Sequence, residues 1–392
     1  MSNRCRVLEL CPISCKYEEK IRHIRDYAYD IDIRFRSMKI SDINDLVNEV
    51  CQYLVQILNK RRNIKITELY YRAARTIIKY LLGENSKNKL ELNDKRLPPL
   101  VDYIFSLFYV WYSMNNLSSK PAYCPRCNTK LYVFTNFCPV CKSGIKTSYK
   151  EFRQCYKLKP EEDVIGRMGI GIARAILNMT INDYYVAFEG PKFRDIPLET
   201  DIIITEGKSD MQNILLIEAK VHPAIYIPVV VGKKLDMDIP FVRIESERLH
   251  VKELIRHFIL SVGFDDFCEI WWKLWSEDKN LLKRAEGLLY GSRGPYDDTK
   301  NKPGIARTDD LKKALAQMIM YSTIRLECKK YEHKLFTGIF SNVYPKEKWG
   351  DLLKLIYTTE YVTNAAKFPL ISAVICLTTN EFREEGVRHI FE

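Results

Sequence analysis

Two carboxylates and a lysine stand at the ends of two apolar segments of the 392-residue chain. Asp201 precedes a run of three isoleucines, and a second apolar run, Ile214–Ile217, leads directly into Glu218-Ala219-Lys220. Side chains alternate between the two faces of a strand, so Glu218 and Lys220 point the same way. If the two runs form an antiparallel hairpin, Asp201 lies beside Glu218. The pattern predicts two carboxylates and a lysine at one edge of a sheet, and such oxygen ligands select Mg²⁺ or Mn²⁺.

This arrangement resembles the PD-(D/E)xK nuclease superfamily, which includes most type II restriction endonucleases. The resemblance covers about residues 163–220. It implies that Asp201 and Glu218 ligate the metal and that the carbonyl oxygen of Ala219 adds a ligand. Lys220 would orient or activate the attacking water. Cleavage would leave a 5′-phosphate and a 3′-hydroxyl, with the metal stabilising charge on the phosphoryl and leaving oxygens.

The resemblance leaves open which residue supplies a further acidic ligand, which superfamily members often draw from the first helix. The candidates are Glu162 and Asp163 at the start of that helix, and Glu189 and Glu199. Gln317 and Tyr321, one helical turn apart, resemble the Gln-x3-Tyr of RecB-like nucleases, although surface residues of a helix can have the same spacing. The alternative for the whole cluster is that its members are strand-end charges that face water.

Four cysteines form two Cys-x-x-Cys units, Cys124 to Cys127 and Cys138 to Cys141, separated by ten residues. In a chain without a secretory signal, paired units of this kind predict metal ligands before disulfides. Zn²⁺ commonly takes four thiolates in a tetrahedron, and no histidine lies near the cluster, so we expect a closed, structural zinc site. The resulting ribbon could place Arg126 against DNA phosphates, or it could only join a helical region to an α/β region.

The net charge of +11 is unevenly distributed along the chain. Residues 1–150 hold 26 Lys and Arg against 14 Asp and Glu, a balance of +12, whereas residues 151–392 hold 35 against 36, a balance of −1. A basic region joined to a neutral one suits a protein that holds a polyanion with one part and acts with the other. A basic surface that only increases solubility would have the same charge.

Length and composition bound the class of protein. The chain exceeds the roughly 250–300 residues at which single cores stop growing, so at least two domains are expected. A composition of 46% hydrophobic and 28% charged residues excludes a collagen, a coiled coil and a disordered chain. No uncharged apolar run reaches the roughly 18 residues needed to cross a bilayer, and no cleavable apolar segment begins the chain. We expect a cytoplasmic, prokaryotic protein without a membrane partner, and its few glutamines, five in all, point to a thermophile.

Apolar spacing predicts helices at Ser41–Leu58, with Ser41 as the cap, at Thr67–Leu82 and at Leu100–Met114. A short basic turn, Asn59–Asn63, separates the first two helices. Two helices around a basic turn could bind DNA, or they could be an ordinary helical hairpin whose basic side chains face water. The basic face of the second helix consists of Arg72, Arg75 and Lys79.

From Asp163 onward, short apolar runs typical of strands alternate with segments of helical periodicity. This order predicts an α/β (α+β) core with a mixed central sheet. The resemblance implies that this core is restriction-endonuclease-like. The predicted helices are Val164–Leu177, Val251–Val262, Thr308–Glu327 and Lys346–Tyr357. The predicted strands are Tyr184–Phe188, Asp201–Thr205, Ile214–Ala219, Lys334–Phe340 and Ile371–Leu377. The domains are a basic helical region, a zinc ribbon and a nuclease domain with an insertion at about 222–305; their bounds are 1–117, 118–150 and 151–392.

Arg293 and Arg307, near the end of the insertion, fit target recognition in a groove, because arginine forks match guanine edges. The insertion also contains a tryptophan cluster that belongs to a core or a dimer interface, or stacks on bases if exposed. Its members are Trp271, Trp272 and Trp275.

Together these features predict a Mg²⁺- or Mn²⁺-dependent type II restriction endonuclease that contains structural Zn²⁺ and cleaves double-stranded DNA. We expect a homodimer, because cutting both strands of a symmetric site calls for two-fold symmetry. The alternatives are a repair, recombination or transposon-end nuclease with the same core, and a non-enzymatic zinc-ribbon DNA-binding protein.

Overall fold

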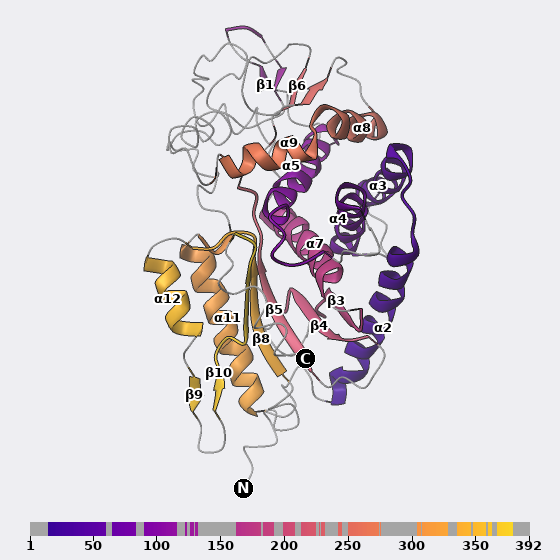
Figure 1. Ribbon diagram of the computed structural model, residues 1–392. Coiled ribbons are helices and arrows are strands. Elements are labelled where there is room, and N and C mark those ends of the chain that lie inside the picture. Colours follow the sequence, from indigo (N-terminus) through magenta and orange to yellow (C-terminus); the bar gives the residue numbers. More distant parts are fainter. Residues whose placement is uncertain are drawn as a thin grey trace.

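The computed structural model (Figure 1) describes most of the helical and sheet-forming segments of the chain. The described residues are 15–59, 65–83, 90–115, 122–123, 126–128, 130–131, 162–181, 183–191, 199–207, 213–224, 227, 229–231, 242–244, 250–273, 275, 304–306, 308–327, 335–345, 348–357, 360–362 and 367–378. None of the helices in these segments is both long and apolar enough to cross a bilayer.

A five-stranded mixed sheet forms the centre of the molecule (Figure 1). Its strands, in spatial order, are β11 (Ala373–Cys376), β8 (Leu335–Ser341), β5 (Ile214–Lys220), β4 (Ile202–Glu206) and β3 (Tyr185–Glu189). β3, β4 and β5 form an antiparallel meander, whereas β8 runs parallel to β5 and β11 runs parallel to β8. The predicted mixed central sheet is therefore confirmed, and each strand overlaps its predicted range.

The sheet is buried on both faces, which explains why its strands are nearly continuous apolar runs. Ile202 and Ile204 of β4 belong to the same core as helix α7 (Glu162–Thr180), while Ile203 belongs to the core formed with helix α11 (Thr308–Glu327). In Figure 1, α11 lies on one side of the sheet and α7 lies on the other. Alternate residues of one strand therefore face different helices, and this alternation decides which side chains can share a site.

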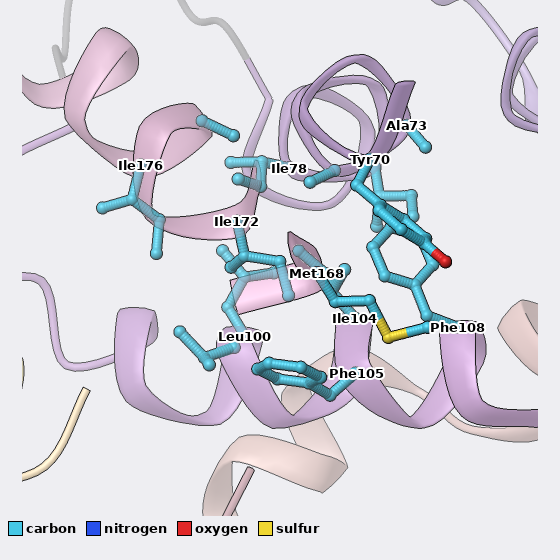
Figure 2. Close-up of a cluster of buried hydrophobic side chains, with 14 of the residues drawn as sticks. Tyr70, Ala73, Ile78, Leu100, Ile104, Phe105, Phe108, Met168, Ile172 and Ile176 are labelled. Atoms are coloured by element: carbon cyan, nitrogen blue, oxygen red, sulfur yellow. The ribbon is translucent and has the colours of Figure 1, made fainter. Parts of the chain in front are cut away.

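In the described part of the chain, four helices precede α7 in sequence and share a core with it. They are α2 (Cys15–Ser37), α3 (Ile43–Leu58), α4 (Ile66–Leu82) and α5 (Leu97–Asn115). Figure 2 shows Tyr70 of α4, Phe105 of α5 and Met168 of α7 in one cluster of buried side chains. Gly171 lets α7 approach α4 closely, because a Cβ atom there would lie 2.8 Å from the backbone nitrogen of Tyr71. One continuous core therefore connects the helices to the α7 face of the sheet.

Helix α2 has no counterpart among the helices predicted from apolar spacing. Its buried positions recur at helical spacing, but charged residues occupy two of them. Those positions are Ile21, Arg25, Ala28, Asp32 and Phe35. The prediction relied on the spacing of apolar residues, so the two charged residues in this buried stripe prevented the helix from being predicted.

The position of α2 also corrects the prediction that the basic face of α4 binds DNA. Arg75 is buried, where its guanidinium contacts the carboxylate of Asp32 and donates to the hydroxyl oxygen of Tyr71 at 3.0 Å. Lys79 is also buried, and its ammonium donates to the carbonyl oxygen of Phe35 in α2 at 2.8 Å. Both side chains therefore connect α4 to its neighbours and do not form a DNA-facing surface.

Arg72, the third residue of that basic face, is also engaged within the protein. Its Nε lies 2.9 Å from a carboxylate oxygen of Glu68, and its Nη2 donates to the hydroxyl oxygen of Tyr27 at 3.1 Å. The predicted hairpin of α3 and α4 is present, but its basic face is internal.

Among the helix starts that differ from the predicted ones, two have a local explanation. The cap of α3 is Asp42 rather than Ser41, because the Asp42 carboxylate accepts the backbone N–H groups of Asn44 and Asp45 at 2.6 and 3.0 Å. Helix α5 begins at Leu97 and includes two prolines in its first turn. Proline is tolerated there because the first N–H groups of a helix have no partner within the helix.

The remaining described elements include a second, smaller sheet (Figure 1). A four-stranded sheet consists of β1 (Ala122–Tyr123), β2 (Lys130–Leu131), β6 (Val229–Val231) and β7 (Val242–Ile244). It pairs the segment that contains the cysteine units with the insertion, since β2 is antiparallel to β6. The other elements are α8 (Val251–Ser261), α9 (Phe264–Trp272), η3 (Gly304–Ala306), α12 (Lys348–Tyr357) and the antiparallel pair β9 (Glu360–Val362) and β10 (Lys367–Pro369).

Of the interpretations of the tryptophan cluster, a place in the core is confirmed for Trp271. Its side chain is buried, and its Nε1 donates to a carboxylate oxygen of Asp102 in α5 at 2.6 Å. Its ring stacks on that of Trp275, with 5.3 Å between centroids. The other oxygen of Asp102 accepts the backbone N–H of Ala224 at 2.8 Å, so this buried carboxylate ties the insertion to α5.

Candidate active site

The structure brings Asp201 and Glu218 together where β4 begins and β5 ends. Ile202 of β4 pairs with Ile217 of β5, so the residue before the first and the residue after the second are neighbours. The carboxylate of Asp201 accepts the backbone N–H of Ala219 at 2.9 Å, which fixes its orientation against β5. The hairpin predicted from the two apolar runs is therefore present, with its two carboxylates at one sheet edge.

Lys220 completes this cluster on the face of the sheet that α11 covers. Leu216 of the same strand lies in the α11 core, and side-chain alternation places Glu218 and Lys220 on that face. The ammonium of Lys220 contacts the carboxylate of Glu218. Their side chains are 17% and 11% exposed, so the pair is largely shielded from water but remains accessible from solvent.

Burial raises the pKa values of both carboxyl groups. Burial is the main reason that the pKa of Asp201 rises to about 7, and the charge of Glu218 adds to it, while Lys220 and the Ala219 N–H oppose it. Burial also raises the pKa of Glu218, against the opposing effect of Lys220. Burial by itself would lower the pKa of Lys220, but the charges of Glu218 and Asp201 outweigh it and raise that pKa. A further positive charge between the carboxylates would relieve this repulsion.

Helix α11 places Gln317 and Tyr321 against the chain that enters β4. The side-chain amide of Gln317 and the hydroxyl of Tyr321 each donate to the carbonyl oxygen of Glu199, both at 3.0 Å. Tyr321 is buried, and its pKa is raised by that burial and by the charge of Glu218. The pair therefore lies next to the cluster and holds the backbone two residues before Asp201.

The other predicted acidic residues lie elsewhere. Glu189 pairs with Ile202 in the sheet, so its side chain is on the α7 face, where Lys65 lies 3.7 Å away, although its charge still raises the pKa of Asp201. Asp163, 58% exposed at the start of α7, pairs with Arg167 at 3.3 Å. The side chain of Glu162 lies outside the described part, and Glu199 is exposed and contributes its backbone carbonyl. None of the described side chains among these adds a third carboxylate to the cluster.

Among the described residues, no three His, Cys, Asp or Glu side chains are arranged to hold a metal ion. A cation at Asp201 and Glu218 would therefore rely on two carboxylates, with the Ala219 carbonyl as a possible addition. This donor set fits Mg²⁺, which commonly keeps several waters and uses one or two carboxylates together with substrate phosphate oxygens.

Asp310, which was not among the predicted site residues, acts electrostatically on Lys220. It is buried at the start of α11, and its negative charge contributes to the raised pKa of Lys220. Its Oδ2 atom lies 3.8 Å from Nε2 of His222, two residues beyond Lys220. Acidic residues at a helix start are common because they interact favourably with the helix dipole, so the sequence offers no special signal for Asp310.

Of the remaining predicted site residues, the structure describes Arg126 and Cys127. Arg126 is exposed. Of the four cysteines predicted to bind zinc, Cys127 is described and half-buried, so zinc binding stays a prediction. The residues outside the described part are Cys124, Cys138, Cys141, Arg293 and Arg307.

Comparisons of this chain with protein-family models, with curated proteins and with solved structures find no match.

Proposed function

We propose that this chain is a Mg²⁺- or Mn²⁺-dependent DNA endonuclease with a PD-(D/E)xK-type site. The proposal rests on one observation above all: a shielded cluster in which Asp201 and Glu218 from adjacent strands lie beside Lys220. The sequence resemblance assigns these three residues to metal binding and water activation. Their juxtaposition within a mixed sheet supports that assignment.

The charges of the cluster favour a divalent cation. Burial disfavours the charged form of both carboxyl groups and raises their pKa values, and the charge of Glu218 raises the pKa of Asp201 further. The Ala219 N–H holds one oxygen of Asp201, which leaves its other oxygen and the Glu218 carboxylate as ligands. When bound, the cation would stabilise negative charge on the phosphoryl and leaving oxygens.

The protein side chains have separate tasks in the proposed hydrolysis. Lys220 would orient a water molecule whose oxygen forms a bond to phosphorus as the bond to the 3′ oxygen breaks. That oxygen takes up a proton, and the products carry a 5′-phosphate and a 3′-hydroxyl. Gln317 and Tyr321 position the site indirectly, because they hold the carbonyl group of Glu199.

DNA as the substrate is supported by the charge of residues 1–150, a balance of +12. The arginine and lysine residues of α4 do not contribute, since they are internal. Lys65 is a better candidate for a phosphate contact, because it is exposed, follows the basic turn in sequence and lies 3.7 Å from Glu189 at the end of β3. That strand end is next to the start of β4, where Asp201 lies.

A plasmid cleavage assay tests the proposal. Supercoiled DNA is incubated with Mg²⁺ and wild-type protein, Glu218→Gln or Lys220→Ala, with EDTA as the metal-free control. Glu269→Gln is the matched control, because Glu269 is an exposed residue of α9 outside the cluster. We expect the wild type and the control to cleave, and both cluster variants to lose about 100-fold or more of the rate.

The products distinguish the more specific functions. Discrete fragments from linear DNA support a type II restriction endonuclease, whose cutting of both strands would be expected to require a homodimer. Preferential nicking of branched DNA supports a repair or recombination nuclease. DNA binding without metal-dependent cleavage contradicts the nuclease proposal and favours a zinc-ribbon DNA-binding protein.

A further inference from the structure

Two acidic residues from different elements act on the charge of Lys220. Its ammonium contacts Glu218 of its own strand. Asp310, at the start of α11, lies 3.8 Å from Nε2 of His222, two residues beyond Lys220, and its charge contributes to the raised pKa of Lys220. Asp310 is buried, so its carboxylate interacts with Lys220 with little screening by water.

The start of α11 is held closely against the end of β5. Gly304 of η3 has a φ of +57°, and a Cβ atom at this position would lie 2.9 Å from the carbonyl oxygen of Lys220. The next residue, Ile305, donates its backbone N–H to Ser341 Oγ at 3.1 Å. Ser341 in turn pairs with Lys220 across β5 and β8. Asp310 therefore follows a segment that is tied to the strand end of Lys220.

The chain that follows Lys220 is held from the other side. The side chain of Asn342 donates to the carbonyl oxygen of His222 at 2.6 Å and accepts the His222 backbone N–H at 3.3 Å. The imidazole of His222 is 3.8 Å from the carboxylate of Asp310. The backbone that precedes Asp310 and the backbone that follows Lys220 are thus held by these contacts. The Lys220 side chain, with its four rotatable bonds, is the part that can move.

A cation at Asp201 and Glu218 would compete directly with Lys220. The ammonium contacts the carboxylate that the cation would also need, and two positive charges at this separation repel strongly in a shielded site. An ammonium that loses its partner in a shielded position is costly unless another counter-charge receives it. Asp310 offers that counter-charge.

We propose that Lys220 exchanges carboxylate partners, pairing with Glu218 when the metal is absent and with Asp310 when a divalent cation is bound by Asp201 and Glu218. This inference rests on the proposed metal-dependent function. Asp310 is then a positioning residue, because it acts through Lys220 and does not bind the metal. The exchange keeps the ammonium charged and close to the site while it frees Glu218 for the cation.

Binding of Mn²⁺ to the full-length protein without DNA, measured by electron paramagnetic resonance, tests the exchange through a double-mutant cycle. We expect Asp310→Asn to weaken Mn²⁺ binding by about 5- to 10-fold, since the displaced ammonium has lost its second partner. Lys220→Met removes the competing ammonium, so its affinity should equal or exceed that of the wild type. In Lys220→Met, the additional change Asp310→Asn should have no effect, because Asp310 acts only through Lys220.

The matched control is Asp309→Asn, which removes a neighbouring charge from the same helix start. Asp309 is exposed, so the control reproduces the change in helix-end charge without removing the buried carboxylate. It should leave Mn²⁺ affinity unchanged. Thermal unfolding of each variant verifies that the protein is folded, and Asp310→Glu should restore part of the lost affinity.

Two results would overturn the partner exchange. If Asp310→Asn weakens Mn²⁺ binding equally with and without the Lys220→Met change, Asp310 acts on the metal or the fold directly. If the wild type and Asp201→Asn bind Mn²⁺ equally, the cation is not at this site. A protein that obeys the cycle but does not cleave DNA would disprove the nuclease proposal and leave the exchange intact.

Discussion

Charged side chains lie on both faces of the central sheet, but the two groups differ in the sign of their excess charge. On the α7 side, Glu68 contacts Arg174 and lies 2.9 Å from Arg72. Asp32 contacts Arg75 and lies 2.5 Å from Arg36. Each of these carboxylates therefore faces two guanidinium groups, and the network has an excess of positive charge.

The cluster on the α11 side has the opposite balance. Glu218 contacts Lys220, and the charges of Asp201 and Asp310 also act on that ammonium. Three carboxylates therefore act on the charge of one lysine, and His222 lies 3.8 Å from one of them, Asp310. The deficit of positive charge here is what a divalent cation would supply.

In the α7-side network, the guanidinium groups that exceed the carboxylates in number also bind partners inside the protein. Arg174 donates to the carbonyl oxygen of Ala187 in β3 at 2.9 Å, and its guanidinium lies over the ring of Tyr71, 3.8 Å from the ring centroid. Asn178 also engages Ala187, accepting its N–H at 2.6 Å and donating to its carbonyl oxygen at 2.9 Å. These contacts attach α7 to an edge strand.

Buried charge by itself thus does not indicate a functional site, whereas an excess of mutually repelling carboxylates does.

The largest expected difference between the two groups is in stability. Arg75→Met leaves the buried Asp32 short of a partner and should lower the free energy of unfolding by about 3 kcal/mol. Lys220→Met should lower it less, because protonation of a neighbouring carboxyl group can relieve the remaining repulsion. Urea unfolding followed by circular dichroism measures both. Equal losses in the two variants would contradict the distinction between an anchoring network and a site.

A second difference is in the response to pH without metal. The pKa of Asp201 is about 7 in the folded protein and 3.8 in the unfolded chain, so the folded state binds the proton more tightly. This contribution to stability is complete below about pH 4 and is lost as the pH rises through about 7.

Asp201→Asn removes this dependence, so in EDTA the variant should unfold at a higher temperature than the wild type at pH 8. The advantage should shrink towards pH 5. Thermal unfolding at several pH values provides the measurement, and Mg²⁺ should raise the unfolding temperature of the wild type but not of the variant. A constant difference across this pH range would contradict the raised pKa.

The smallest expected effect on stability and cleavage rate comes from the residues that bind the backbone just before β4. Tyr321→Phe removes one hydrogen bond to the carbonyl oxygen of Glu199 and should reduce stability by about 1 kcal/mol. If the proposed function is correct, the cleavage rate should fall by about 10-fold or less, since Gln317 still donates to the same oxygen. A loss as large as that of Lys220→Ala would show that Tyr321 acts on the reaction directly.

The parts of the fold that were predictable have regular local patterns. Thr308–Glu327 was predicted with the bounds that the structure has, because a long amphipathic stretch has clear ends. The apolar runs on either side of a polar turn predicted β4, β5 and their antiparallel pairing. The juxtaposition of Asp201 and Glu218 followed from that pairing, since alternation and register are local properties of a hairpin.

The parts that were not predictable depend on partners distant in sequence. Arg25 and Asp32 interrupt the apolar stripe of α2, so apolar periodicity did not reveal that helix. Without α2, Arg75 and Lys79 resemble a solvated basic face, because nothing near them in sequence indicates that another helix covers them. Asp310 was missed for the same reason, as it reaches Lys220 only when α11 packs on the sheet.

The sequence by itself determined β4 and β5, their antiparallel pairing and the three residues at their ends, because alternation and hydrophobic burial act over short stretches of chain. Only the tertiary structure decided which charges are buried together. That choice depends on the packing of α2 against α4 and of α11 against β5, which brings segments up to a hundred residues apart into electrostatic contact. In a shielded interior, the net charge of a group of side chains affects its energy far more than in water. The packing therefore made the α7-side network an anchor and the α11-side cluster a candidate active site.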